Sequence, residues 1–82
     1  MLILISDQFY PQFLDELVQF GEVTIDKERY VDADIIIVRS STKIDSLYLS
    51  NAKKLKLVIR GGVGLDNIDL EQANKLEIKV CI

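Results

Sequence analysis

The sequence predicts an α/β fold in which five strands form one parallel sheet with helices on both faces. Short apolar runs recur along the chain, and helical or polar segments separate them. The 82 residues, 49% of them hydrophobic, are enough for one compact domain spanning 1–82. Such alternation indicates right-handed crossovers between parallel strands. With five strands the usual order is 2-1-3-4-5, the three-layer flavodoxin-like (Rossmann-like) arrangement.

The first third of the chain predicts a buried strand followed by an amphipathic helix. Residues 2–5 are a continuous apolar run, which is typical of a strand buried on both faces. The loop Ser6-Asp7 follows and offers a helix cap, Pro11 falls in the first helical turn, and Gly21 is expected to end the helix. The apolar residues recur at helical spacing and are expected to pack into the core: Phe9, Phe13, Leu17 and Phe20, with Leu14 and Val18 beside them.

The middle of the chain contains the most strongly β-favouring run. Residues 23–25 predict a short second strand, and the polar stretch 26–34 predicts a connection with at most one helical turn near 28–31. Residues 35–38, all isoleucine or valine, predict a central parallel strand. A loop at 39–42 follows its carboxyl end.

The last part predicts two more helices and two more strands. The elements are expected at 45–52 (helix), 57–59 (strand), 70–75 (helix) and 78–82 (edge strand). In the helix at 45–52 and its flanks, the residues expected to face inward are Ile44, Leu47, Tyr48 and Leu55.

A glycine-rich loop joins the fourth strand to the last helix. Gly61, Gly62 and Gly64 lie in a stretch where the backbone must turn tightly or approach another group. Asp69 is placed to cap the following helix, with Gln72 three residues later answering as in a capping box.

Composition excludes several classes of function. The net charge is −3 and acidic and basic residues are mixed, so no nucleic-acid partner is expected. No apolar run approaches the ~18 residues of a membrane span. Cys81 is the only cysteine, which precludes an internal disulfide and fits a cytoplasmic location. Histidine, the commonest general acid–base, is absent.

The loops after the strands predict a site for an anion. In an open parallel sheet, ligands bind at the carboxyl ends of the strands, near the point where the strand order reverses. The loops 6–7, 39–42 and 60–64 meet there, and they carry two guanidinium groups, Arg39 and Arg60, as well as hydroxyls and glycine amides. Such groups suit a carboxylate or a phosphate. From spacing alone, an equal alternative is that the glycines only permit a turn and the arginines are solvated.

A dinucleotide is not expected to bind this glycine loop. Gly62 and Gly64 give the first part of a G-x-G-x-x-G motif, but Asn67 stands at its third glycine position. No acidic residue ends a strand where it could read a ribose from that loop.

Two motifs together resemble a known family. The run V-R-S-S-T at 38–42 and the run R-G-G-V-G-L-D-N-I-D at 60–69 are similar to the N-terminal substrate-binding segment of D-2-hydroxyacid dehydrogenases, most of all the D-3-phosphoglycerate type. The resemblance covers nearly the whole chain. It implies NAD-linked, reversible oxidation of a D-2-hydroxy acid to the 2-oxo acid.

The resemblance also implies roles for particular residues. Arg39 and Ser40 would contact the substrate, including the phosphate end in the phosphoglycerate type. The glycine loop would present amides to the substrate carboxylate. The substrate-binding set is therefore expected to be Arg39, Ser40, Arg60, Gly62, Val63 and Gly64.

The sequence departs from the family pattern in ways that bear on activity. Ile59 and Gly61 stand where the family often has glycine and alanine, and Ile82 stands where it usually has asparagine. The family's catalytic residues and dinucleotide loop lie beyond the matched segment. The chain is thus expected to be a truncated half-domain that binds no cofactor and is inactive alone. Its partner would be a small anionic 2-hydroxy or 2-oxo acid.

Alternative functions follow from the same pattern. A structural or assembly module would self-associate through an exposed apolar face or the edge strand. A phospho-receiver needs an aspartate just after the third strand, where Arg39 and Ser40 stand instead. A flavin site needs a hydroxyl-rich loop after the first strand, which 6–8 does not provide.

Overall fold

The computed structural model describes residues 1–62, 64 and 66–81, and it contains the predicted five-stranded parallel sheet. The strand order is β2-β1-β3-β4-β5, and all four pairings are parallel, as the sequence predicted. The elements are β1 (Leu2–Ile5), α1 (Pro11–Leu17), β2 (Glu22–Thr24), the 3-10 helix η1 (Lys27–Asp32), β3 (Ile35–Val38), α2 (Ser46–Asn51), β4 (Leu57–Arg60), α3 (Leu70–Lys75) and β5 (Lys79–Cys81).

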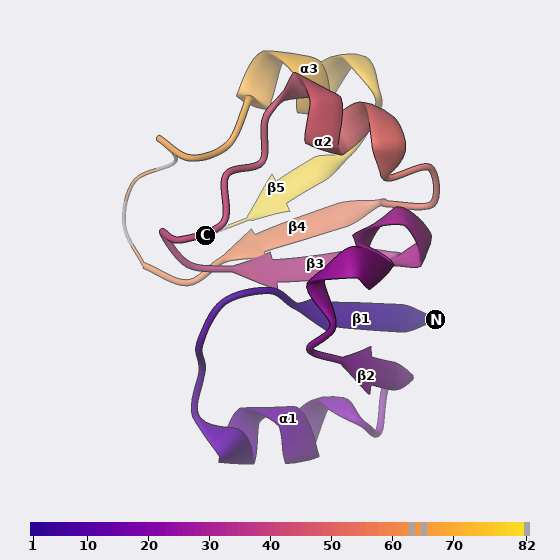
Figure 1. Cartoon of the computed structure of the whole chain (residues 1–82), viewed down its shortest axis with the longest axis vertical. Helices are drawn as coiled ribbons and strands as arrows, with labels where there is room; N and C mark the ends of the chain where they lie inside the picture. The colour runs from indigo at the N-terminus through magenta and orange to yellow at the C-terminus, as the bar shows by residue number, and fades with distance from the viewer. Residues whose placement is uncertain (63, 65, 82) are drawn as a thin grey trace.

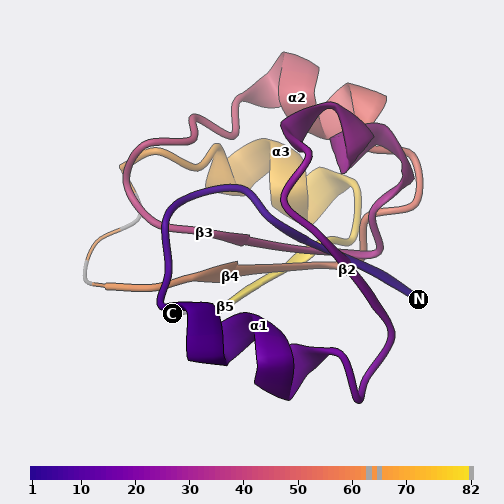
Figure 2. The ribbon, with the colours of Figure 1, turned by 60° about the horizontal axis from the view of Figure 1, so that its bottom comes forward.

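The sheet separates two unequal apolar layers. Figure 2 shows α1 on one side of the sheet and α2, α3 and η1 on the other. The larger layer lies under α2 and α3 and includes Leu4, Ile36 and Val58, all fully buried. The smaller layer, centred on Ile3 and Ile37, packs against α1. Because β1 and β3 are covered on both faces, their sequences are continuous apolar runs with no polar alternation.

Helix α1 is shorter than its apolar periodicity predicted. It ends at Leu17, so Val18 and Phe20 lie beyond it. They are 59% and 61% exposed, so the prediction of a core role for these two residues was wrong. Gly21 does not end the helix either. It lies where the chain passes Met1, and a Cβ on Gly21 would lie 2.5 Å from the Met1 carbonyl oxygen. The need for glycine is therefore steric and has no connection with a helix cap.

The predicted inward face of α2 was partly wrong. Ile44 and Leu55 are buried as expected, but Leu47 is 71% exposed and Leu49 is buried in its place. The helix has only six residues and begins after Asp45, whose carboxylate accepts a hydrogen bond from the Tyr48 amide at 2.9 Å. That cap fixes where the helix starts and therefore which leucine faces the sheet.

Helix α3 begins with half of the predicted capping box. The Asp69 carboxylate accepts a hydrogen bond from the Gln72 amide at 3.0 Å. The Asp69 amide donates instead to the Ile44 carbonyl at 2.8 Å, so Gln72 does not return the bond. The hydrogen bond from the Asp69 amide to the Ile44 carbonyl joins the start of α3 to the segment that follows β3.

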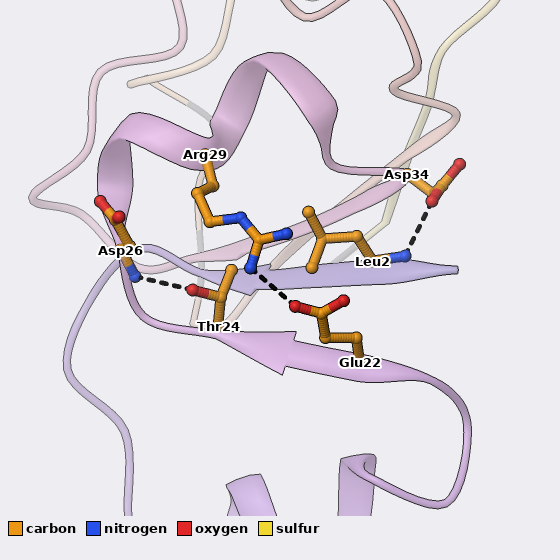
Figure 3. A network of polar contacts seen from close by, with 6 residues as sticks. All are labelled: Leu2, Glu22, Thr24, Asp26, Arg29 and Asp34. Carbon is orange, nitrogen blue, oxygen red and sulfur yellow. Dashed lines mark hydrogen bonds and ion pairs between the residues drawn. The ribbon is translucent and has the colours of Figure 1, made fainter.

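Polar contacts close the sheet at the amino ends of its strands. Asp34 accepts a hydrogen bond from the Leu2 amide at 2.8 Å, and Arg29 pairs with Glu22 at 2.7 Å (Figure 3). These groups satisfy the first amide of β1 and join η1 to β2. They lie at the opposite end of the strands from the loops described next. None of the described helices is long and apolar enough to cross a membrane.

Candidate functional site

Three loops lie together at the carboxyl ends of β1, β3 and β4, on the left of Figure 1. They are residues 6–8, residues 39–44, and the described residues 61, 62, 64 and 66–69. The Ser6 amide donates to the Ile37 carbonyl at 2.9 Å, and Ile44 forms an isolated parallel bridge with Ile68. The sequence-based expectation that these loops are neighbours is therefore correct.

Asp7 holds the 39–42 loop from the β1 side. One carboxylate oxygen accepts hydrogen bonds from the amides of Arg39, at 2.6 Å, and Thr42, at 3.1 Å. The other accepts from the Thr42 hydroxyl at 2.6 Å. Burial raises the pKa of the Asp7 carboxyl, but these hydrogen bonds and the charge of Lys27 outweigh burial and hold the pKa below its ordinary value. Asp7 was expected to cap α1, but its carboxylate is engaged by this loop, and the residue at the α1 N-cap is Tyr10.

Asn67 holds the same loop from the β4 side. Its side-chain nitrogen donates to the carbonyl of Arg39 at 2.8 Å and to the carbonyl of Thr42 at 2.7 Å. Asp7 and Asn67 thus bind the amide and the carbonyl groups of the same two residues. The backbone of the 39–42 loop is fixed from both sides, while the Arg39 side chain stays exposed.

Arg60 lies inside the site and not on its surface. It is the last residue of β4 and only 9% exposed, and its Nε donates to the Asn67 side-chain oxygen at 2.9 Å. A Cβ on Gly62 would lie 2.8 Å from Arg60 Nη1. The Arg60 guanidinium therefore lies beneath the glycine loop, where it orients Asn67 and brings positive charge close to the backbone at Gly62.

Arg39 carries the exposed guanidinium of the site. Its Cζ lies 5.6 Å from the centroid of the Phe9 ring. Nη1 makes a long hydrogen bond of 3.5 Å to the Gln8 carbonyl. Among the described residues, no carboxylate lies within ion-pairing distance of Arg39.

The glycine loop has backbone conformations that favour glycine. Gly62 has φ +126° and Gly64 has φ +85°, both in the region that L-amino acids rarely adopt. Ser40 lies exposed at the tip of the 39–42 loop. Val63, the remaining predicted site residue, lies outside the described residues. The structure thus brings Arg39, Ser40, Arg60 and the two glycines to one end of the sheet.

Reasoning from the sequence missed the residues that organise the loops. Asp7 was interpreted as a helix cap, Asn67 only as a break in a dinucleotide motif, and Phe9 as core. Asp7 lies 32 and 35 positions from its partners Arg39 and Thr42, and Asn67 lies 28 and 25 positions from the same two residues. Local pattern carries no signal for contacts of that range.

The chemistry available at this site is recognition of an anion. An exposed guanidinium, a hydroxyl and a glycine loop over a buried guanidinium can hold a carboxylate or a phosphate. The Asp7 carboxylate accepts three hydrogen bonds from the 39–42 loop and is poorly placed to accept a proton from a substrate.

Comparison with known proteins decides the family. The model for "D-isomer specific 2-hydroxyacid dehydrogenase, catalytic domain" matches residues 3–82. The chain belongs to this family. A D-3-phosphoglycerate dehydrogenase of Methanocaldococcus jannaschii is 37% identical over 86 aligned positions, which cover 95% of this chain and 16% of that protein.

Solved structures show the same fold in longer proteins. A protein of Pyrococcus horikoshii superposes with a TM-score of 0.86 at 32% identity, covering 99% of this chain and 27% of the other. An NAD-bound 3-phosphoglycerate dehydrogenase of Entamoeba histolytica gives 0.79 at 31% identity, covering 98% and 32%. This chain therefore spans about a sixth of the curated relative and about a third or less of these two structures.

The glycine loop does not fit a dinucleotide. Asn67, at the third position of the incomplete motif, uses its amide to hold the 39–42 loop. Helix α3 begins only at Leu70, six positions after Gly64, so the glycines do not lead directly into a helix as a pyrophosphate site requires.

Proposed function

We propose that this chain forms the first part of the substrate-binding domain of an NAD-linked D-2-hydroxyacid dehydrogenase of the D-3-phosphoglycerate type. The observation that carries the proposal is the 39–42 loop, which Asp7 and Asn67 fix from two sides, while the Arg39 guanidinium has no ion-pair partner among the residues that the structure describes. The names of the relatives support the substrate class. The 82 residues form a half-domain that binds acid weakly and does not turn it over.

Within this proposal, each predicted residue has a part. Arg39 and Ser40 contact the phosphate end of the substrate, because they are exposed at the tip of the fixed loop. The backbone at Gly62, Val63 and Gly64 contacts the carboxylate. Arg60 acts from beneath, by orienting Asn67 and adding positive charge under the glycine loop.

Two arginine variants test the binding role. Arg39→Gln removes the exposed guanidinium, and Arg29→Gln removes the arginine that pairs with Glu22 at the other end of the sheet (Figure 3). By calorimetry or equilibrium dialysis, D-3-phosphoglycerate should bind the wild type and Arg29→Gln alike and Arg39→Gln at least several-fold more weakly. Equal binding by all three chains would overturn the assignment.

A second assay tests inactivity. The chain is mixed with NAD and D-3-phosphoglycerate, and NADH absorbance is followed. We expect no turnover, because the Asp7 carboxylate is engaged by the 39–42 loop and the sequence lacks histidine. Sustained NADH formation by the purified chain would refute this part of the proposal.

Self-association is the second candidate property. Helix α1 is the only described helix on its side of the sheet (Figure 2), and Ile35, Leu57 and Ile59 remain partly exposed there. Strand β5 is an edge, with β4 as its only described neighbour. A concentration series by sedimentation equilibrium should show dimers at the higher concentrations, and a monomer throughout would exclude self-association.

The cytoplasmic location suggested by the single cysteine stays a prediction.

A further inference from the structure

The exposed guanidinium of Arg39 lies on an aromatic ring that is itself held in place. The Phe9 ring packs against Phe13 with centroids 5.3 Å apart. On another side it meets the backbone of Gly61, where a Cβ would lie 3.2 Å from the Phe9 ring. Phe9 thus links the three loops of the site: it directly follows the β1 loop, lies against Gly61 of the β4 loop, and supports the arginine of the β3 loop.

This arrangement keeps the charge of Arg39 available. Asp7 contacts the backbone of Arg39, but its carboxylate is taken up by the Arg39 and Thr42 amides and the Thr42 hydroxyl. An aromatic face attracts a guanidinium without neutralising it, whereas a carboxylate partner would cancel its charge. The guanidinium borders an open cleft of about 330 Å³ lined by Gln8, Phe9, Tyr10, Pro11 and Arg39.

We propose that Phe9 is a positioning residue for acid recognition, which holds the Arg39 guanidinium at the mouth of this cleft as an uncompensated cation. The inference rests on the proposed function, in which Arg39 binds the acid. Phe9 touches no substrate in this account and acts only through Arg39. Gly61 contributes to this positioning, because a side chain at residue 61 would push against the Phe9 ring.

The test compares Phe9 with a phenylalanine outside the site. Phe9→Leu keeps an apolar side chain but removes the aromatic face, and Phe9→Tyr restores the face. Phe20→Leu is the matched control, because Phe20 lies beyond α1 and is 61% exposed, whereas Arg39 lies over the Phe9 ring. Each chain is studied by NMR of the Arg39 Nε–H signal, which the ring current of Phe9 shifts, and by calorimetric titration with D-3-phosphoglycerate.

We expect Phe9→Leu to move the Arg39 Nε–H signal and to weaken D-3-phosphoglycerate binding about two- to five-fold, the range for an exposed cation–π contact. Phe9→Tyr and Phe20→Leu should keep both values close to wild type. An Arg39 signal that does not respond to Phe9→Leu, or an unchanged affinity, would overturn the role of Phe9. A wild-type chain that binds no acid, with an Arg39 signal that still responds, would instead refute the proposed function.

Discussion

Replacing Asn67 with alanine should destabilise the whole chain, because one side chain joins two loops and a buried arginine. The change removes two donors to the carbonyls of Arg39 and Thr42 and the acceptor for Arg60 Nε. Each such bond contributes about 0.5–1.5 kcal/mol net. Because Asn67 is half-buried, we expect each of the three hydrogen bonds to contribute near the middle of this range. The free energy of unfolding should therefore fall by about 2 to 3 kcal/mol.

The chain should tolerate this loss and remain measurable. A domain of 82 residues typically has about 4–12 kcal/mol of stability. Urea unfolding followed by far-ultraviolet circular dichroism gives the free energy of unfolding for each variant. Asn74→Ala, on the exposed surface of α3, is the matched control and should stay within about 0.5 kcal/mol of wild type.

A second variant separates the contacts of Asn67. Asn67→Asp keeps an acceptor for Arg60 but loses both donors and places negative charge beside two carbonyl oxygens. It should be at least as unstable as Asn67→Ala. If Asn67→Ala were as stable as the Asn74→Ala control, the reasoning that Asn67 holds the loops together would be refuted.

Three further predictions concern other parts of the site and core. Asp7→Asn should lower the free energy of unfolding at neutral pH. Because the pKa of Asp7 is depressed in the folded state, the carboxylate stabilises the fold above the ordinary carboxyl pKa, and this contribution is lost as the pH falls through the folded-state pKa. The difference in stability between wild type and Asp7→Asn should therefore shrink below about pH 4. Gly62→Ala should destabilise the chain more than Gly64→Ala, because both have positive φ but only Gly62 also lacks room, with a guanidinium beneath it. Leu49→Ala should cost about 2–5 kcal/mol in urea unfolding, whereas Leu47→Ala should change little, because Leu49 is 1% and Leu47 71% exposed.

Each of these predictions has a clear contrary result. A stability difference between wild type and Asp7→Asn that stays constant down to pH 3 would mean that the carboxylate is not held by the loop. Equal destabilisation by the two glycine variants would remove the steric role of the arginine. Similar losses at Leu47 and Leu49 would place the inner face of α2 elsewhere.

The sheet was predictable from the sequence because its signal is local. Continuous apolar runs such as 2–5 and 35–38 indicate strands buried on both faces, and such strands are central to a parallel sheet. The cap of α3 was equally readable, since Asp69 and its partner amide at Gln72 are three positions apart. The loops then meet at one end of the sheet as a consequence of its topology.

The errors arose where short elements leave helical phase undefined. A six-residue helix makes fewer than two turns, so apolar spacing could not decide between Leu47 and Leu49. Likewise, the spacing of Phe20 suggested that it continues the apolar face of α1, but the helix ends at Leu17, before Phe20.

The organisation of the site could not be predicted because its contacts are distant in sequence. Asp7 and Asn67 meet the 39–42 loop only after the sheet has formed, and the inward turn of Arg60 depends on Asn67. The sequence indicated which loops lie together, and the tertiary structure decided which of their side chains are buried and which stay exposed.

The most direct test of the central claim is an amide chemical-shift map of the ¹⁵N-labelled chain during titration with D-3-phosphoglycerate. The account predicts saturable shifts concentrated at residues 39–42 and 61–64, with little change near Glu22, Arg29 and Asp34 at the other end of the sheet (Figure 3). Shifts that do not saturate, or that centre on that opposite end, would contradict the claim that these loops form an acid-binding site.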